Sequence, residues 1–238
     1  MPIPTYRLII DGVTAMFGIK RRVHQAYNLG KFFFRQRVIG FAVPTEPEFD
    51  EPSKRVFIDL LTKSSFYLEY GSGGSTLMAA RNKKRFISVD TDWWFLRSVR
   101  KATGKLSANQ RLIHADIGLT GPWGKPLRAT RLSASRLAQW RSYSGTPWES
   151  ITVGDMPDLV LVDGRFRVST TLLCCQKLAN NPDARILVDD YVGRSGYSVI
   201  ERHADLIGMA GRMAIFKPRS TSDASLQEAV TQHATAWE

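Results

Sequence analysis

The chain has 238 residues and a formal net charge of +11, from 33 Lys and Arg against 22 Asp and Glu. That length suits one α/β domain with an appended segment, and it is long enough to bury a substantial core. Hydrophobic residues at 43% and charged residues at 23% exclude a wholly disordered chain. Two cysteines are too few for a disulfide scaffold or a Cys-rich zinc site.

Residues 1–43 are predicted to form a basic arm, because they carry seven Lys and Arg against one Asp. The spacing of Ile9, Val13 and Met16 places them on one face of a helix. Residues 32–34, three phenylalanines, follow a second basic cluster. Two interpretations stay open. The arm either lies as an amphipathic helix on an anionic membrane surface, or packs on its own domain or on the second subunit of a homodimer.

The sequence also bears on the compartment. No uncharged apolar run approaches the ~20 residues that a bilayer span requires. The charges at residues 20–22 follow an apolar stretch, whereas a secretory signal places them before it. The neighbouring Cys174 and Cys175 are expected to be reduced, since adjacent cysteines bridge only with strain. We therefore expect a cytoplasmic protein, with peripheral contact to the inner membrane under the first interpretation of the arm.

A linker is predicted over residues 44–52, which hold three prolines and four acids. A short helix follows, with Ser53 as its expected N-cap. The main domain is then expected to span residues 53–238.

Strands and helices alternate through most of this domain. Apolar, strand-like runs occur at 66–70, 85–90, 111–116, 158–163, 185–190, 205–210 and 212–217. The first five are separated by helical patterns, which predicts a doubly wound α/β fold with helices on both faces of a mostly parallel sheet. The last two are separated by a single glycine and predict a terminal hairpin, so one strand of the sheet should be antiparallel.

Residues 117–157 interrupt the alternation as a long insertion. The segment is rich in large aromatic residues, namely Trp123, Trp140, Tyr143 and Trp148. Long insertions in compact domains are commonly lids or binding loops. We expect at least one of these rings to line a ligand cleft, although core packing is the alternative.

Ligands of open α/β sheets bind beyond the carboxyl ends of the strands, where this sequence has polar residues. The first strand ends in a Gly-rich loop after Glu69, which includes Gly71, Ser72 and Gly73. Glycines allow close approach of the backbone to a ligand. Asp90 ends the second strand about twenty residues after the Gly loop, a position from which a carboxylate can accept both hydroxyls of a ribose.

Further acids end the other strands. Asp116 ends the third and can reach an exocyclic amine. Asp163, Asp189 and Asp190 end the fourth and fifth strands, which are neighbours in the usual doubly wound order. Three converging carboxylates require a cation or protons. Either Mg²⁺ or Ca²⁺ binds there, since both take oxygen ligands, or the acids pair with nearby arginines. The candidate partners are Arg165, Arg167 and Arg194.

This order of motifs resembles the class I S-adenosylmethionine-dependent methyltransferases over residues 53–217. The resemblance implies a seven-stranded sheet of order 3-2-1-4-5-7-6 with the last strand antiparallel. It also implies that the loop from Glu69 to Gly73 lies against the methionine part of the cofactor, that Asp90 holds the ribose, and that Asp116 lies near the adenine.

A narrower resemblance links the two Asp-containing strand ends to the metal-dependent O-methyltransferases of the macrocin and catechol type. It implies that Asp163, Asp189 and Asp190 ligate Mg²⁺. Arg165 stands where the macrocin-type enzymes have an acid thought to be the base, and a guanidinium cannot serve as a base at neutral pH. We therefore take Asp163, Asp189 and Arg165 as the catalytic candidates, with Arg165 suited to an anionic substrate group.

The sequence thus predicts an S-adenosylmethionine-dependent methyltransferase that acts on oxygen of a small-molecule or glycan acceptor rather than on nucleic acid. His114 and His203 are further candidate bases by residue type. One alternative is a non-catalytic module of the same fold that binds nucleic acid, anionic lipid or glycan through the basic arm. Another is an NAD-dependent oxidoreductase, although the glycine spacing departs from G-x-G-x-x-G.

Overall fold

The computed structural model describes residues 24–127, 132–220 and 224–238. The chain divides into two units, Met1–Phe41 and Ala42–Glu238. In the first unit, residues 24–34 are helical and continue into the π-helical turn η1 (Arg35–Ile39). The Phe32 ring contacts the rings of Phe33 and Phe41, each at 5.7 Å between centroids. The helical spacing predicted around Ile9 lies outside the described residues.

The segment predicted as a linker is partly integral to the second unit. Helix α2 (Glu51–Lys63) begins inside it, and its N-cap is Asp50, which accepts a hydrogen bond from Ser53 N at 2.9 Å. The prediction of Ser53 as the N-cap was therefore wrong by one turn. Its hydroxyl instead donates to the Ala210 carbonyl at 2.7 Å. Arg81 donates to the Thr45 carbonyl at 3.2 Å, which anchors the start of this segment on the domain.

Deletion of residues 1–43 is expected to leave a folded domain, because the cut removes the first unit and spares the anchoring contacts that begin at Thr45. Circular dichroism and urea unfolding measure this directly. The same deletion is expected to abolish binding to vesicles of anionic lipid, and raising the salt should mimic the loss for the full chain. A truncated chain that fails to fold would show that the arm belongs to the core.

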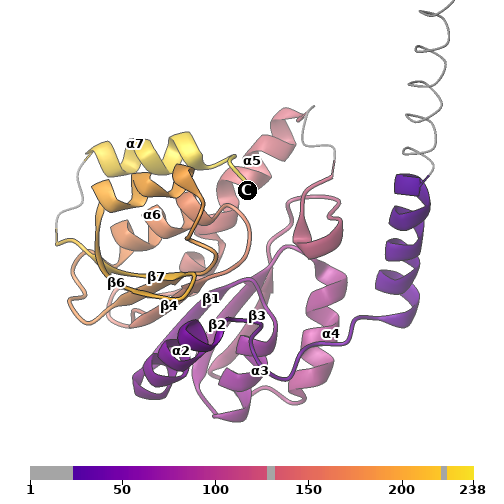
Figure 1. The fold of residues 1–238 in the computed structure, drawn as a ribbon, viewed down its shortest axis with the longest axis horizontal. Coiled ribbons are helices and arrows are strands. Elements are labelled where there is room, and N and C mark those ends of the chain that lie inside the picture. The colour runs from indigo at the N-terminus through magenta and orange to yellow at the C-terminus, as the bar shows by residue number, and fades with distance from the viewer. Residues whose placement is uncertain (1–23, 128–131, 221–223) are drawn as a thin grey trace, which may run out of the picture. The chain divides into compact units, whose positions relative to one another are not determined.

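Seven strands form one sheet, in the order β3-β2-β1-β4-β5-β7-β6. Strands β1 to β5 pair in parallel, and β7 pairs antiparallel with both β5 and β6. The predicted order and the antiparallel last strand are confirmed (Figure 1). The strands span Phe66–Tyr70 (β1), Arg85–Asp90 (β2), Gln110–His114 (β3), Leu159–Val162 (β4), Arg185–Val188 (β5), Ala204–Ala210 (β6) and Met213–Pro218 (β7).

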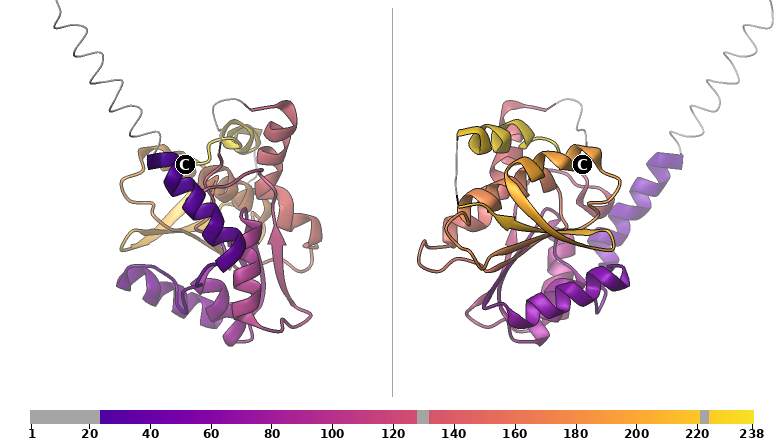
Figure 2. Two further views of the ribbon diagram at one scale, coloured as in Figure 1. Left: turned by 90° about the vertical axis from the view of Figure 1, so that its right-hand side faces the viewer. Right: turned by 60° about the vertical axis from the view of Figure 1, so that its left-hand side comes forward.

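Helices cover both faces of this sheet (Figure 2). On one face, α6 (Arg167–Lys177), α7 (Ala224–His233) and the insertion form the larger core with residues such as Leu68 and Val160. On the other face, α2 and α3 (Gly74–Arg81) form the smaller core around Tyr67 and Leu161. Successive residues of one strand thus enter different cores, as the pleat requires. Buried on both faces, the central strands are nearly continuous in apolar residues.

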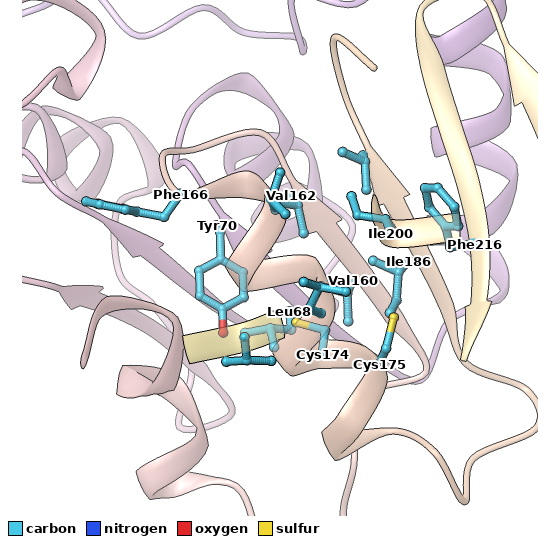
Figure 3. Close-up of a cluster of buried hydrophobic side chains, with 14 of the residues drawn as sticks. Leu68, Tyr70, Val160, Val162, Phe166, Cys174, Cys175, Ile186, Ile200 and Phe216 are labelled. Carbon is cyan, nitrogen blue, oxygen red and sulfur yellow. The ribbon is translucent and has the colours of Figure 1, made fainter. Parts of the chain in front are cut away.

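The larger core includes both cysteines (Figure 3). Cys174 and Cys175 are buried and free, and they pack with Tyr70, Val162 and Ile186. Both thiols are therefore side chains of the hydrophobic core. Two further α-helices are α4 (Trp93–Thr103), between β2 and β3, and α5 (Ala134–Ser142), within the insertion.

Among the described residues, no helix has both the length and the apolar character needed to cross a membrane.

Candidate functional site

The central crevice of the sheet lies between β1 and β4, because the strand order reverses there. The loops that follow these strands meet backbone to backbone. Gly71 has φ +100°, and a Cβ added there would lie 2.7 Å from Gly164 N. A side chain at position 71 would therefore be excluded by both space and backbone conformation. The predicted Gly-rich loop thus lies at the edge of the sheet where a ligand is expected.

Glu69, on β1, holds the residues that follow this loop through hydrogen bonds. Its side chain is fully buried, and its carboxylate accepts hydrogen bonds from the hydroxyls of Ser75, Thr76 and Ser88. Burial raises the pKa of Glu69, although the hydrogen bonds from these hydroxyls lower it in part. All of these partners belong to the domain, so the structure gives Glu69 a positioning role for the loop and α3. The contact of Glu69 with the methionine part of the cofactor stays a prediction.

Asp90 connects the Gly-rich loop to the end of β2. Its carboxylate accepts hydrogen bonds from Ser72 N at 2.9 Å and from Asp92 N at 2.8 Å. The residue is 8% exposed, and burial raises the pKa of its carboxyl to about 7 against these two N–H donors. The predicted residues Gly71, Ser72 and Asp90 are therefore brought together at one place.

Replacing Asp90 with asparagine is expected to change how stability depends on pH. In the folded domain Asp90 keeps its proton up to about pH 7, whereas in the unfolded chain it ionises near its ordinary value of 3.8. Its contribution to stability is therefore fully present below about pH 4 and is lost as the pH rises to about 7. An asparagine side chain cannot ionise, so the variant escapes this loss.

Urea unfolding at several pH values tests this expectation. The unfolding free energy of Asp90→Asn minus that of wild type should increase between about pH 4 and pH 7 and level off above pH 7. A difference that stays constant with pH would show that the native carboxyl titrates as it does in the unfolded chain.

Two other predicted site residues, His114 and Asp116, lie at the end of β3, next to the end of β2, where His114 pairs with Asp90. Asp116 is exposed; it accepts hydrogen bonds from Gly118 N at 2.7 Å and from the Gln139 amide at 3.2 Å, so it ties the start of the insertion to α5. The His114 ring contacts the Trp93 ring at 5.6 Å. His203 directly follows η4 (Ser195–Arg202), which comes after β5 in the chain.

The three acids at the ends of β4 and β5 are paired with arginines. Asp163 pairs with Arg167 at 3.0 Å, and Asp189 pairs with Arg212 at 3.1 Å. Asp190 pairs with both of these arginines and also with Arg194 at 3.4 Å. The structure therefore shows the ion-pairing alternative, with Arg212 as a partner in place of the predicted Arg165. Across the described ranges, no group of three or more His, Cys, Asp and Glu is arranged to hold a metal ion.

Arg167 is the centre of this cluster. It is 4% exposed, and its guanidinium also donates to the carbonyls of Gly164, Asp163 and Asp189. Asp163 keeps about a third of its side chain accessible, at 33%. Burial raises the pKa of Asp163 to about 7, with Arg167 lowering it and Asp189 and Asp190 raising it. Asp163, which directly follows β4, is thus both partly accessible and able to exchange a proton near neutral pH.

Most of the large aromatic side chains of the insertion pack in the core and do not form a lid. Trp140 and Trp148 are buried and donate to the carbonyl of Ile117 and to the hydroxyl of Tyr70. Trp123 is 76% exposed. Tyr143 differs, because a Cβ added at Gly164 would lie 2.6 Å from its hydroxyl oxygen. One of the four predicted aromatics therefore reaches the end of β4, and the expectation of core packing holds for two others.

Sequence reasoning missed several residues of this region. Ser88 is a polar residue on the same strand face as the buried Phe86, and that break in an apolar face was a detectable signal. Arg212 lies in the β6–β7 turn, and Tyr197 lies on η4. Neither carries a local pattern that indicates the site, because only the pairing of β7 with β5 brings Arg212 to Asp189.

The strand order and the ligand-side loops together define the class I S-adenosylmethionine-dependent methyltransferase fold. A solved methyltransferase-like protein from Silicibacter pomeroyi is similar over 81% of this chain and 99% of its own, with 30% identity and a TM-score of 0.65. The chain therefore belongs to this family of methyltransferase-like proteins. No protein-family model and no curated protein matches the sequence.

Two further solved structures are similar at lower levels. A TehB-like SAM-dependent methyltransferase from Corynebacterium glutamicum has 13% identity and a TM-score of 0.42, over 72% of this chain and 90% of its own. The N-methyltransferase NodS from Bradyrhizobium japonicum has 14% identity and a TM-score of 0.39, over 71% of this chain and 98% of its own.

Proposed function

We propose that the protein transfers a methyl group from S-adenosylmethionine to an oxygen of a small-molecule or glycan acceptor. The observation that carries the proposal is the meeting of Gly71, Ser72 and Asp90 at the crevice of a sheet with the family's strand order. The 30% identity to a methyltransferase-like protein supports the same assignment.

The residues present fit this cofactor. A Cβ at Gly73 would meet no atom within 4 Å, so the loop borders open space at the N-terminus of α3. Asp90 lies next to this loop through its bond to Ser72 N, and its carboxylate is the natural acceptor for ribose hydroxyls. We assign the ribose to Asp90 and the methionine part to the loop from Gly71 to Gly73, held in place by Glu69.

In the proposed reaction the cofactor supplies an electrophilic methyl carbon. Asp163 takes the proton from the acceptor hydroxyl, because its raised pKa near 7 matches a base that works at neutral pH and its side chain is accessible. Arg167 holds the Asp163 carboxylate through an ion pair at 3.0 Å and fixes its orientation. Asp189, nearly fully buried, contributes by holding Arg212.

Titration of the purified protein with S-adenosylmethionine and, separately, with NAD tests the proposal. We expect S-adenosylmethionine and its demethylated product to raise the melting temperature, by an amount equivalent to about 2.7 kcal/mol at a hundredfold excess over Kd. NAD should have no effect. Stabilisation by NAD alone would favour the oxidoreductase, and stabilisation by neither would favour the non-catalytic module.

A further inference from the structure

The negative and positive charges of the acid and arginine side chains beyond β4 and β5 are unequal in number. Three carboxylates face four arginines, and Arg167, Arg194 and Arg212 account for all the ion pairs that these acids make among the described residues. Arg165 takes part in none of these pairs. The cluster therefore carries one positive charge more than its own acids neutralise.

Arg165 is also withdrawn from water. It is only partly exposed, and its Nε is buried without a hydrogen-bond partner among the described residues. Burial lowers the pKa of Arg165, and the neighbouring Arg167 lowers it further, but a guanidinium stays charged at neutral pH. A partly buried charge without an ion-pair partner is unfavourable, and an anion bound beside it would relieve that cost.

Two buried hydroxyls lie in the electrostatic neighbourhood of Arg165, those of Tyr143 and Tyr197. Tyr143 is 1% exposed and Tyr197 is 4% exposed. The Arg165 backbone N–H lies near the Tyr143 hydroxyl, but among the described residues neither hydroxyl proton has an acceptor. Buried polar groups are ordinarily satisfied, so unpartnered hydroxyls beside an unpaired guanidinium point to a missing ligand atom. The Tyr143 hydroxyl lies against Gly164, directly after the end of β4.

We propose that Arg165, Tyr143 and Tyr197 form an anion-binding subsite that holds a carboxylate or phosphate group of the methyl acceptor. A guanidinium and hydroxyl donors together suit oxyanions, which accept several short hydrogen bonds at once. The assignment to the acceptor rests on the proposed function, whereas the anion site itself does not. The carboxylate of the cofactor has the same chemistry, so the experiment separates the two sources.

The first arm of the test uses inorganic phosphate as the probe, on the full chain at constant ionic strength. Calorimetry should detect phosphate binding to wild type, and Arg165→Gln should weaken it by about tenfold or more, as loss of a charged hydrogen-bonding partner does. Tyr143→Phe and Tyr197→Phe should each weaken it less. Arg194→Gln is the matched control, because it removes an equal charge from the same cluster, and phosphate affinity should change less than twofold.

Melting temperatures measured with and without phosphate show whether the Arg165 variant is folded and whether it binds phosphate. Arg165 faces Arg167 and has no ion-pair partner in the described ranges, so Arg165→Gln should melt no lower than wild type without phosphate. Phosphate should raise the melting temperature of wild type and leave that of Arg165→Gln unchanged. An equal response of both proteins to phosphate would overturn the subsite, as would unfolding of Arg165→Gln, since that would show an existing structural partner.

The second arm compares S-adenosylhomocysteine with 5′-methylthioadenosine, which lacks the amino-acid carboxylate. We expect Arg165→Gln to bind both as wild type does. Selective weakening of S-adenosylhomocysteine would overturn the assignment to the acceptor and give the anion to the cofactor. The protein could also bind phosphate through Arg165 but bind neither nucleoside. That result would support the anion subsite and contradict the proposed function, so failure of the subsite and failure of the function are distinguishable.

Discussion

Replacing Arg167 with methionine is expected to lower the free energy of unfolding by about 3–5 kcal/mol, the usual cost of removing one partner from a buried ion pair. Methionine fills similar space but leaves the carboxylate of Asp163 and the carbonyls of Gly164 and Asp189 without their donor. Asp190 loses one of its three arginines. Arg167 therefore acts as the internal counter-ion of the carboxyl edge of the sheet.

Arg194→Met is the control for this prediction. Arg194 pairs with the same Asp190, but its side chain is 37% exposed and its one ion pair is 3.4 Å long. Pairs of this kind contribute about 0–1 kcal/mol. Urea unfolding of both variants gives the comparison. If Arg167→Met costs no more than Arg194→Met, the buried network contributes little and the acids are balanced in another way.

Replacing Asp90 with alanine is expected to weaken S-adenosylmethionine binding by about 1.5–3 kcal/mol, the range for loss of hydrogen bonds to a charged group. This is roughly a ten- to 150-fold increase in Kd. Two effects add in the same direction. The variant loses the acceptor for the ribose hydroxyls, and it releases Ser72 N, which positions the Gly-rich loop. Isothermal calorimetry with purified protein at about pH 8, where Asp90 is ionised, measures the change.

Asp158→Ala provides the matched control. Asp158 also accepts two backbone N–H groups, from Ser65 at 2.8 Å and from Phe66 at 3.2 Å, but at the opposite edge of the sheet, where β1 begins. Its loss should reduce stability and leave cofactor affinity within twofold of wild type. An unchanged affinity in Asp90→Ala, or an equal loss in both variants, would remove the ribose from Asp90.

Most of the strands were predictable because local patterns indicated them, whereas their order in the sheet was implied by the resemblance to the methyltransferase family. Residues 159–162 are apolar without alternation, which indicates a strand covered on both faces, and the single Gly211 between two strand-like runs indicates a hairpin. Element ends were less predictable. The helix of residues 51–63 begins one turn earlier than expected, because Asp50 caps it and also accepts a hydrogen bond from Arg212 N across the domain.

The sequence alone indicated several features of the site. These are the loop that carries Gly71, the acid Asp90, and the acids at the ends of β4 and β5. In a parallel sheet the carboxyl ends of the strands share one edge, so residues that end successive strands converge whatever lies between them. That regularity explains why the sequence placed Asp163 and Asp189 together. It does not say which groups neutralise them.

Tertiary structure alone decided the balance of charge at that edge. Arg212 reaches Asp189 because β7 pairs antiparallel with β5, a contact between residues far apart in the chain. Arg167 turns inward onto the acids, whereas its neighbour Arg165 takes no acid as a partner in the described structure. Two arginines separated by one residue look equivalent in a sequence. Their roles diverge because packing, which depends on the whole fold, determines how much water each one keeps and which partner it meets.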